Sequence, residues 1–185
     1  IVDTGRVNFN EKSVLQSFVY NGKENTFDRS QKRYLVPQGE FMPYVYKWAL
    51  TLFGYGELVA RLEKDMSYVV GPNTTQADFA DSSPGVLFCF ESVSPWGVQK
   101  ILAERGEVPF IAHPVSHAWF NKPTILWKNL NTMLRVQAIW SDQYIVSAGG
   151  HVEGIVISPS GNIEPLENIT NGDQWTVKRA FIPKR

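Results

Sequence analysis

This sequence has very little cysteine and no net charge. It contains one cysteine, Cys89, and its 18 Lys and Arg residues are balanced by 18 Asp and Glu residues. One cysteine excludes a disulfide within the chain and fits a reducing compartment, where a single buried thiol is ordinary. A formal net charge of zero excludes a positive field over the whole molecule, so any contact with RNA must be local.

Long hydrophobic runs are also missing. No apolar stretch approaches the roughly 18 to 20 residues that span a bilayer, and the first residues lack the basic-then-apolar layout of a signal peptide. We therefore expect a soluble protein with no membrane span. Because the chain begins at Ile1 rather than Met, we expect it to be either cut from a longer precursor or expressed as a fragment.

Aromatic residues, in contrast, are abundant. Six Trp, seven Tyr and eleven Phe make up 13% of the chain, a bias that is typical of strands and of interfaces. Two short helices are predicted, one over residues 11–20 and a largely buried one over residues 42–53. Strand-length runs dominate the rest, and they cover residues 57–64, 85–92, 122–130, 133–140, 142–148, 151–158 and 174–182.

The spacing of these runs indicates a single β-rich domain. No internal repeat or low-complexity linker divides the 185 residues, and the longest polar stretch, residues 71–84, is expected to be an exposed loop. Many strands at intervals of about ten residues favour a sandwich or a barrel, in which closing the sheets hides most strand edges.

His113 and His117 lie four residues apart within GEVPFIAHPVSHAWF, residues 106–120. Pro114 argues against a helix, and on a strand the two rings would be about 13 Å apart, whereas ligands of one zinc ion lie about 2 Å from it. A turn at Pro114 would bring them closer, but the only other soft ligands are Cys89 and His151. We expect the two histidines to be structural or interface residues rather than metal ligands.

Cys89 is the one candidate nucleophile. Paired with a histidine it could act in covalent catalysis, but VLFCFES reads as the middle of a strand with Phe on both sides. Burial there would raise the pKa of the thiol and block substrate access. The glycines of GYGELV do not form a phosphate-binding loop, since the third glycine is missing. We predict no catalytic residue, no metal site and no cofactor.

The C-terminal segment VKRAFIPKR is basic. Lys178, Arg179, Lys184 and Arg185 are interleaved with Phe181, an arrangement that suits contact with nucleic acid or with an acidic partner surface. The alternative is that these side chains are simply solvated.

The order of several short motifs resembles that of the capsid proteins of picorna-like viruses, in the iflavirus and dicistrovirus branches. The motifs are LQSFVYNG, RYLVPQG, LTLFGYGELVARLEK and AERGEVPFIAHP, and the match covers roughly residues 11–115. The resemblance implies an all-β fold, an eight-stranded jelly-roll sandwich with short helices. It divides the chain into an N-terminal arm with a short helix (1–29), a jelly-roll domain (30–150) and a C-terminal extension (151–185).

The function that this resemblance implies is structural. The chain would be a non-enzymatic subunit of an icosahedral capsid enclosing an RNA genome, located in the virion and assembled in the host cytoplasm. Its partners would be other capsid proteins, with local contact to genomic RNA and to a host receptor. Trp96, Trp119 and Trp175 would then be covered on assembly or cap the subunit's own core. The alternative function is a β-sandwich binding module, lectin-like or spike-like.

Overall fold

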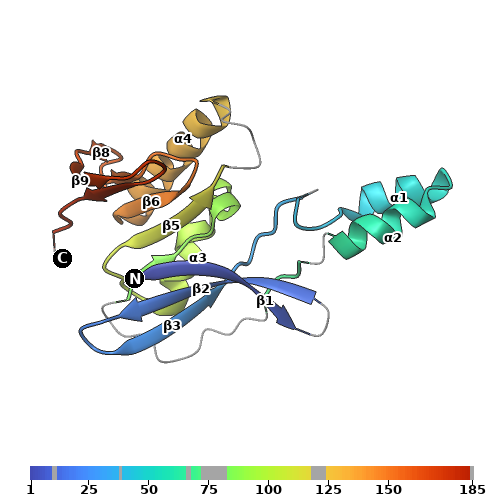
Figure 1. Cartoon of the computed structure of the whole chain (residues 1–185), viewed down its shortest axis with the longest axis horizontal. Coiled ribbons are helices and arrows are strands. Elements are labelled where there is room, and N and C mark those ends of the chain that lie inside the picture. Colours follow the sequence, from blue (N-terminus) through green and yellow to red (C-terminus); the bar gives the residue numbers. More distant parts are fainter. Residues whose placement is uncertain (10–11, 38, 66–67, 72–82, 118–123, 184–185) are drawn as a thin grey trace.

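The chain folds into layers of sheets and helices, from which one helical hairpin projects (Figure 1). The computed structural model describes residues 1–9, 12–37, 39–65, 68–71, 83–117 and 124–183. The elements in chain order are β1 (Val2–Phe9), β2 (Lys12–Asn21), β3 (Thr26–Gln31), α1 (Tyr44–Leu52), α2 (Gly56–Asp65), β4 (Gly85–Val86), η1 (Cys89–Val93), α3 (Gly97–Arg105), β5 (Ile111–Ser116), α4 (Thr124–Ser141), β6 (Ile145–Gly150), β7 (Ile155–Ile157), β8 (Ile163–Glu164), β9 (Glu167–Asn171) and β10 (Thr176–Arg179).

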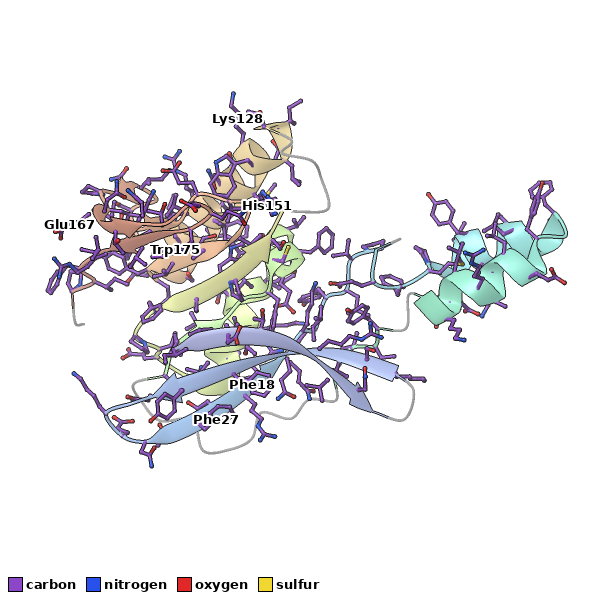
Figure 2. All side chains as sticks on the ribbon, viewed as in Figure 1. Phe18, Phe27, Lys128, His151, Glu167 and Trp175 are labelled. Carbon is purple, nitrogen blue, oxygen red and sulfur yellow. The ribbon has the colours of Figure 1, made fainter. Side chains whose placement is uncertain are left out.

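Strands β1, β2 and β3 form an antiparallel sheet in that order, with Val7 opposite Val14 and Val19 opposite Asp28. The helix predicted over residues 11–20 is therefore wrong, because residues 12–21 form the central strand of the sheet, with buried side chains on both faces. Phe18 and Phe27 lie side by side on neighbouring strands (Figure 2), with ring centroids 5.7 Å apart.

The second sheet has five strands in the order β4-β5-β6-β7-β8. The first three are parallel and the last two join them antiparallel. Parallel neighbours need long crossover connections, and here η1 with α3 links β4 to β5 while α4 lies between β5 and β6. The carboxyl ends of β4, β5 and β6 consequently meet at one edge of the sheet, where ligands bind in most open α/β sheets.

The main apolar core lies between the five-stranded sheet and the helices α3 and α4. Helix α4 buries one stripe at helical spacing, which includes Leu130, Leu134 and Ala138. A smaller cluster of Val19, Val86 and Phe88, with Val2 packed against it, joins the two sheets. The members of the main core are Leu87, Val98, Ile101, Val108, Ile111, Leu134, Ala138, Ile145, Ile155 and Ile157.

Helices α1 and α2 form a hairpin that extends away from both sheets (Figure 1). Helix α1 has no buried residue, and its Trp48 is 68% exposed. An ion pair from Lys47 Nζ to Glu63 Oε1, 2.6 Å long, joins the two helices. The predicted helix over residues 42–53 is thus confirmed as a helix, at Tyr44–Leu52, but the prediction that it is buried is wrong. Among the described residues, no helix is long and apolar enough to cross a membrane.

The exposure of α1 predicts a sharp contrast between two substitutions. Trp48→Ala is expected to change the free energy of unfolding by less than about 0.5 kcal/mol, because an exposed side chain adds little to folding. Leu134→Ala, on the buried face of α4, is expected to lower the free energy of unfolding by about 2 to 5 kcal/mol. Urea unfolding of both variants measures the difference, and a cost above 2 kcal/mol for Trp48→Ala would contradict the projecting hairpin.

The all-β jelly roll is wrong, because the structure is a mixed α/β fold. Residues 57–64, predicted as a strand, lie in α2. Of the predicted strands 122–130 and 133–140, residues 124–130 and 133–140 lie in α4, and residues 122 and 123 are outside the described residues. The run 142–148 overlaps β6, and the runs 151–158 and 174–182 contain β7 and β10. Within the predicted loop at 71–84, residues 72–82 lie outside the described residues. The boundaries drawn after residues 29 and 150 stay a prediction.

Candidate functional site

A pocket of about 550 Å³ opens where the carboxyl ends of β4, β5 and β6 face the three-stranded sheet. Glycine is required in its wall, because a Cβ at Gly149 would collide with the carbonyl oxygen of Val115 on the neighbouring strand. Among the described residues, the charged side chains in the wall belong to Asp3, Lys32 and Glu40. The full lining is Val2, Asp3, Thr4, Leu15, Lys32, Val36, Glu40, Tyr68, Phe88, Cys89, Pro114, Val115, Ser116, Ala148, Gly149 and Gly150.

Cys89 lies at a sharp turn rather than in the middle of a strand. Strand β4 ends at Val86, and Cys89 begins the short 3-10 helix η1 with a φ of 27°, in the region that residues other than glycine rarely adopt. Such backbone strain persists only where surrounding contacts hold it, and it is concentrated at functional sites. The turn leaves Cys89 partly buried in the pocket wall.

The surroundings of the Cys89 thiol act on its pKa in opposite directions. Burial raises the pKa most, while the Lys32 ammonium group and the backbone amides of Ser116 and Phe90 lower it, and the Glu40 carboxylate raises it; the net direction is upward. The three lowering groups are those that would stabilise negative charge on the sulfur or on an oxygen bound beside it.

Lys32 and Glu40 form a buried ion pair in the same pocket. Lys32 Nζ donates to Glu40 Oε1 at 2.5 Å, and the two residues are 2% and 7% exposed. The other carboxylate oxygen, Oε2, accepts the backbone N–H of Val36 at 2.8 Å. One oxygen of Glu40 therefore holds the Lys32 ammonium group, while the other fixes the carboxylate to the backbone at Val36. A buried cation needs such a partner, since an unpaired one would be costly.

Glu91 connects the Lys32 segment to the Cys89 turn. Its Oε1 accepts the backbone N–H groups of Arg33 at 2.6 Å and Tyr34 at 3.1 Å, and its Oε2 accepts that of Phe88 at 2.8 Å. Burial raises the pKa of Glu91, and these amides together with Lys32 lower it, with a net upward direction. One buried carboxylate thus fixes the spacing between the two chain segments that carry Lys32 and Cys89.

The two histidines of the opening motif have separate surroundings. The ring of His113 on β5 lies 2.9 Å from Ser147 Oγ through Nδ1 and 3.0 Å from the Cys89 carbonyl oxygen through Nε2. The ring of His117 packs edge-on against Trp127, with centroids 5.4 Å apart. Burial lowers the pKa of His113 to about 4 and also lowers that of His117. His113 is therefore neutral at physiological pH.

The lowered pKa of His113 predicts a loss of stability in mild acid. Between pH 6.5 and about 4 the unfolded chain binds a proton on this histidine that the folded chain does not, so its contribution is complete above pH 6.5 and is lost as the pH falls. The loss is on the order of 3 kcal/mol. Glu91, whose pKa is raised, acts in the opposite direction.

The measurement is the free energy of unfolding of the parent and of His113→Gln between pH 4 and pH 7. The difference between them is expected to shrink as the pH falls, because only the parent carries this titration. His151→Gln, at an exposed position in a turn, is the matched control. Parallel curves for the parent and His113→Gln would contradict the assignment.

No group of three or more His, Cys, Asp or Glu side chains suited to a metal ion occurs within the described ranges. In the basic segment, Lys178 pairs with Glu153 at 2.8 Å and Arg179 pairs with Glu167 at 2.8 Å, while residues 184 and 185 lie outside the described ranges. Trp175, over the β9–β10 hairpin (Figure 2), is 57% exposed and Trp96 is 65% exposed. Residue 119 is not among those described.

Solved structures similar to this one include a carbon–nitrogen hydrolase and members of the nitrilase superfamily, although no family model matches the sequence. A carbon–nitrogen hydrolase from Helicobacter pylori superposes with a TM-score of 0.61 at 11% identity, covering 88% of this chain and 55% of that one.

Two further structures show the same likeness. An amidase from Nesterenkonia, a glutamate variant carrying acrylamide added to the active-site cysteine, has a TM-score of 0.57 at 13% identity over 88% of this chain and 56% of that one. Nit3 from Saccharomyces cerevisiae has a TM-score of 0.56 at 16% identity, covering 86% of this chain and 52% of that one. The chain thus shares the fold of these proteins and spans about half of their length.

These findings overturn the capsid interpretation. The proteins that share the fold are amidases and related hydrolases rather than viral capsid proteins, so the capsid function, the virion location and the capsid partners are wrong. The alternative binding module finds no support either. The prediction of a non-enzymatic protein is also contradicted, because the structural neighbours include amidases and a carbon–nitrogen hydrolase, one of them with an active-site cysteine, and this chain has a single cysteine in a pocket.

Three residues of the site were missed at the level of sequence. Lys32 and Glu40 stand eight residues apart in KRYLVPQGE, and Glu91 follows Cys89 by two. They could have been predicted from charged residues that stand beside apolar residues at the end of a strand, because such a charge is expected to be buried rather than solvated. The sequence pattern predicts that the strand continues through Cys89, whereas the strand ends at Val86.

Proposed function

We propose that this chain carries the nucleophile of a cysteine-dependent carbon–nitrogen hydrolase, with Cys89 as the attacking residue. The observation that carries the proposal is the position of Cys89, on a strained turn in a pocket that it shares with the buried pair of Lys32 and Glu40. The likeness in fold to amidases with an active-site cysteine supports it.

The proposed reaction is acyl transfer through a thioester. Cys89 Sγ attacks the carbonyl carbon of an amide, a C–S bond forms, and the C–N bond breaks as the amine takes up a proton and leaves. Water then attacks the thioester, releasing a carboxylic acid and restoring the thiol. Negative charge that develops during both steps lies near the Lys32 ammonium group and the backbone N–H groups of Ser116 and Phe90.

Each charged residue has a distinct role in this scheme. Lys32 stabilises the developing charge, and Glu40 holds Lys32 through one carboxylate oxygen while the other accepts a backbone N–H. Glu91 keeps the segment of Lys32 against the turn of Cys89. The expectation that the chain has no catalytic residue is replaced by these assignments.

The test is amine release from a panel of amides that differ in the size and polarity of the acyl group. The protein is expected to release amine from at least one class with saturation kinetics, and Cys89→Ala is expected to release none above background. Release by Cys89→Ala at the parent's rate, or by neither protein on any amide of the panel, would contradict the proposed function.

A further inference from the structure

His113 contacts the backbone of the proposed nucleophile, although it does not face the pocket itself. It is 1% exposed, and its ring bridges Ser147 on β6 and the carbonyl group of Cys89. Ser147 is its register partner across the parallel strands β5 and β6. The ring is therefore held on both sides by groups of the same sheet edge that forms the pocket.

The partners of the ring fix its tautomer. A backbone carbonyl oxygen can only accept a hydrogen bond, so Nε2 carries the hydrogen and donates it to the Cys89 oxygen. Nδ1 is then unprotonated and accepts the hydroxyl hydrogen of Ser147. The neutral ring satisfies both bonds without placing a charge in the core.

The peptide group that His113 holds is the one that follows Cys89. In a trans peptide the C=O and the next N–H point in opposite directions, so fixing the Cys89 carbonyl also fixes the N–H of Phe90. That N–H is one of the backbone amides that stabilise the thiolate of Cys89. Ser92 Oγ donates to the same carbonyl oxygen at 2.8 Å, so two side chains hold it.

We infer that His113 is a positioning residue, whose neutral ring locks the peptide between Cys89 and Phe90 so that the Phe90 N–H remains directed at the sulfur. The role rests on the proposed function for its purpose, since a fixed amide beside the thiolate matters only if Cys89 reacts. The effect of His113 on the thiolate of Cys89 can be measured without a substrate.

The measurement uses the fact that the chain has one cysteine. Iodoacetamide alkylates a thiolate by forming a C–S bond as iodide leaves, so the alkylation rate against pH gives the thiol titration and mass spectrometry assigns it to Cys89. The charged groups that act on this thiol are Lys32 and Glu40. Substitution of His113 leaves both in place and changes only the ring that binds the Cys89 carbonyl group.

His113→Leu puts an apolar side chain of similar bulk in place of the ring and removes the donor. The alkylation rate at pH 8 is expected to fall about tenfold, the ratio that corresponds to losing one hydrogen bond of ordinary net strength, with the titration midpoint shifted upward. His113→Gln, which retains an N–H donor, is expected to recover most of the rate. A merely structural role gives the opposite sign, because a loosened core exposes the thiol and speeds alkylation.

Circular dichroism and thermal melting establish that each variant is folded. If His113→Leu does not fold, Ser147→Ala takes its place, because it removes the hydroxyl donor that fixes the tautomer. It is expected to slow alkylation about twofold to threefold. An unchanged or faster rate with an unchanged midpoint, in whichever variant folds, overturns the positioning role. The two proposals are separable, because slower alkylation without amine release supports the role of His113 and contradicts the hydrolase.

Discussion

Replacing Cys89 by Ser is expected to lower kcat/KM for amide hydrolysis by about 10⁴-fold or more. The effect is large because the nucleophile forms the covalent intermediate, and losing it leaves only binding and charge stabilisation. A serine hydroxyl at the same place is far less acidic than a thiol, and no base that would activate a hydroxyl has been assigned to this site.

The control is Lys128→Ala, at an exposed position on α4 remote from the pocket, which is expected to keep the parent's activity. Cys89→Ser should retain the parent's melting temperature within a few degrees, since the two residues differ by one atom. Activity of Cys89→Ser within tenfold of the parent would show that the thiol is not the nucleophile.

Replacing Lys32 by Met is expected to lower kcat/KM by about 10² to 10³-fold, the range seen when one charge-stabilising group is removed from an active site. The same change raises the pKa of Cys89, because the Lys32 ammonium group lowers it in the parent. It also leaves the Glu40 carboxylate buried without its cation, at a cost of about 3 to 5 kcal/mol in stability.

A double variant separates stability from chemistry. Lys32→Met with Glu40→Gln removes both charges of the pair, so it is expected to regain most of the stability that Lys32→Met loses while remaining as inactive. Denaturant unfolding and kcat/KM are measured on the same preparations. Recovery of activity together with stability would mean that Lys32 serves the fold rather than the reaction.

The helices were the hardest part of the fold to predict from the sequence. In α4 the buried residues Leu130, Leu134, Ala138 and Ser141 recur at helical spacing over 12 residues, but a window of eight residues shows only an alternation that fits a strand equally well. For strand β2 the error was the reverse, since the sequence predicts a helix where the structure has a strand. As the middle strand of its sheet it has buried side chains on both faces, so its apolar residues lose the alternation of a half-exposed strand.

The strands β6 and β7 were predictable because their β-branched runs, IVSAGG and IVI, are short and bounded by turn residues. The site was less accessible to prediction. Glu91 helps to bring Lys32 and Cys89 together by binding the backbone of residues 33 and 34, a contact across up to 58 positions that no local pattern encodes. The turn at Cys89 depends in part on His113, which is 24 positions away.

The central claim is that Cys89 forms a covalent bond with the acyl group of the substrate. The direct test is intact-mass spectrometry during turnover, on the amide of the panel that gives the fastest amine release, followed by digestion to locate the adduct. The account predicts an acyl group on the peptide that contains Cys89, released by hydroxylamine as a thioester is, and absent from Cys89→Ala. Turnover with no acyl group on Cys89, or the same adduct on Cys89→Ala, would contradict it.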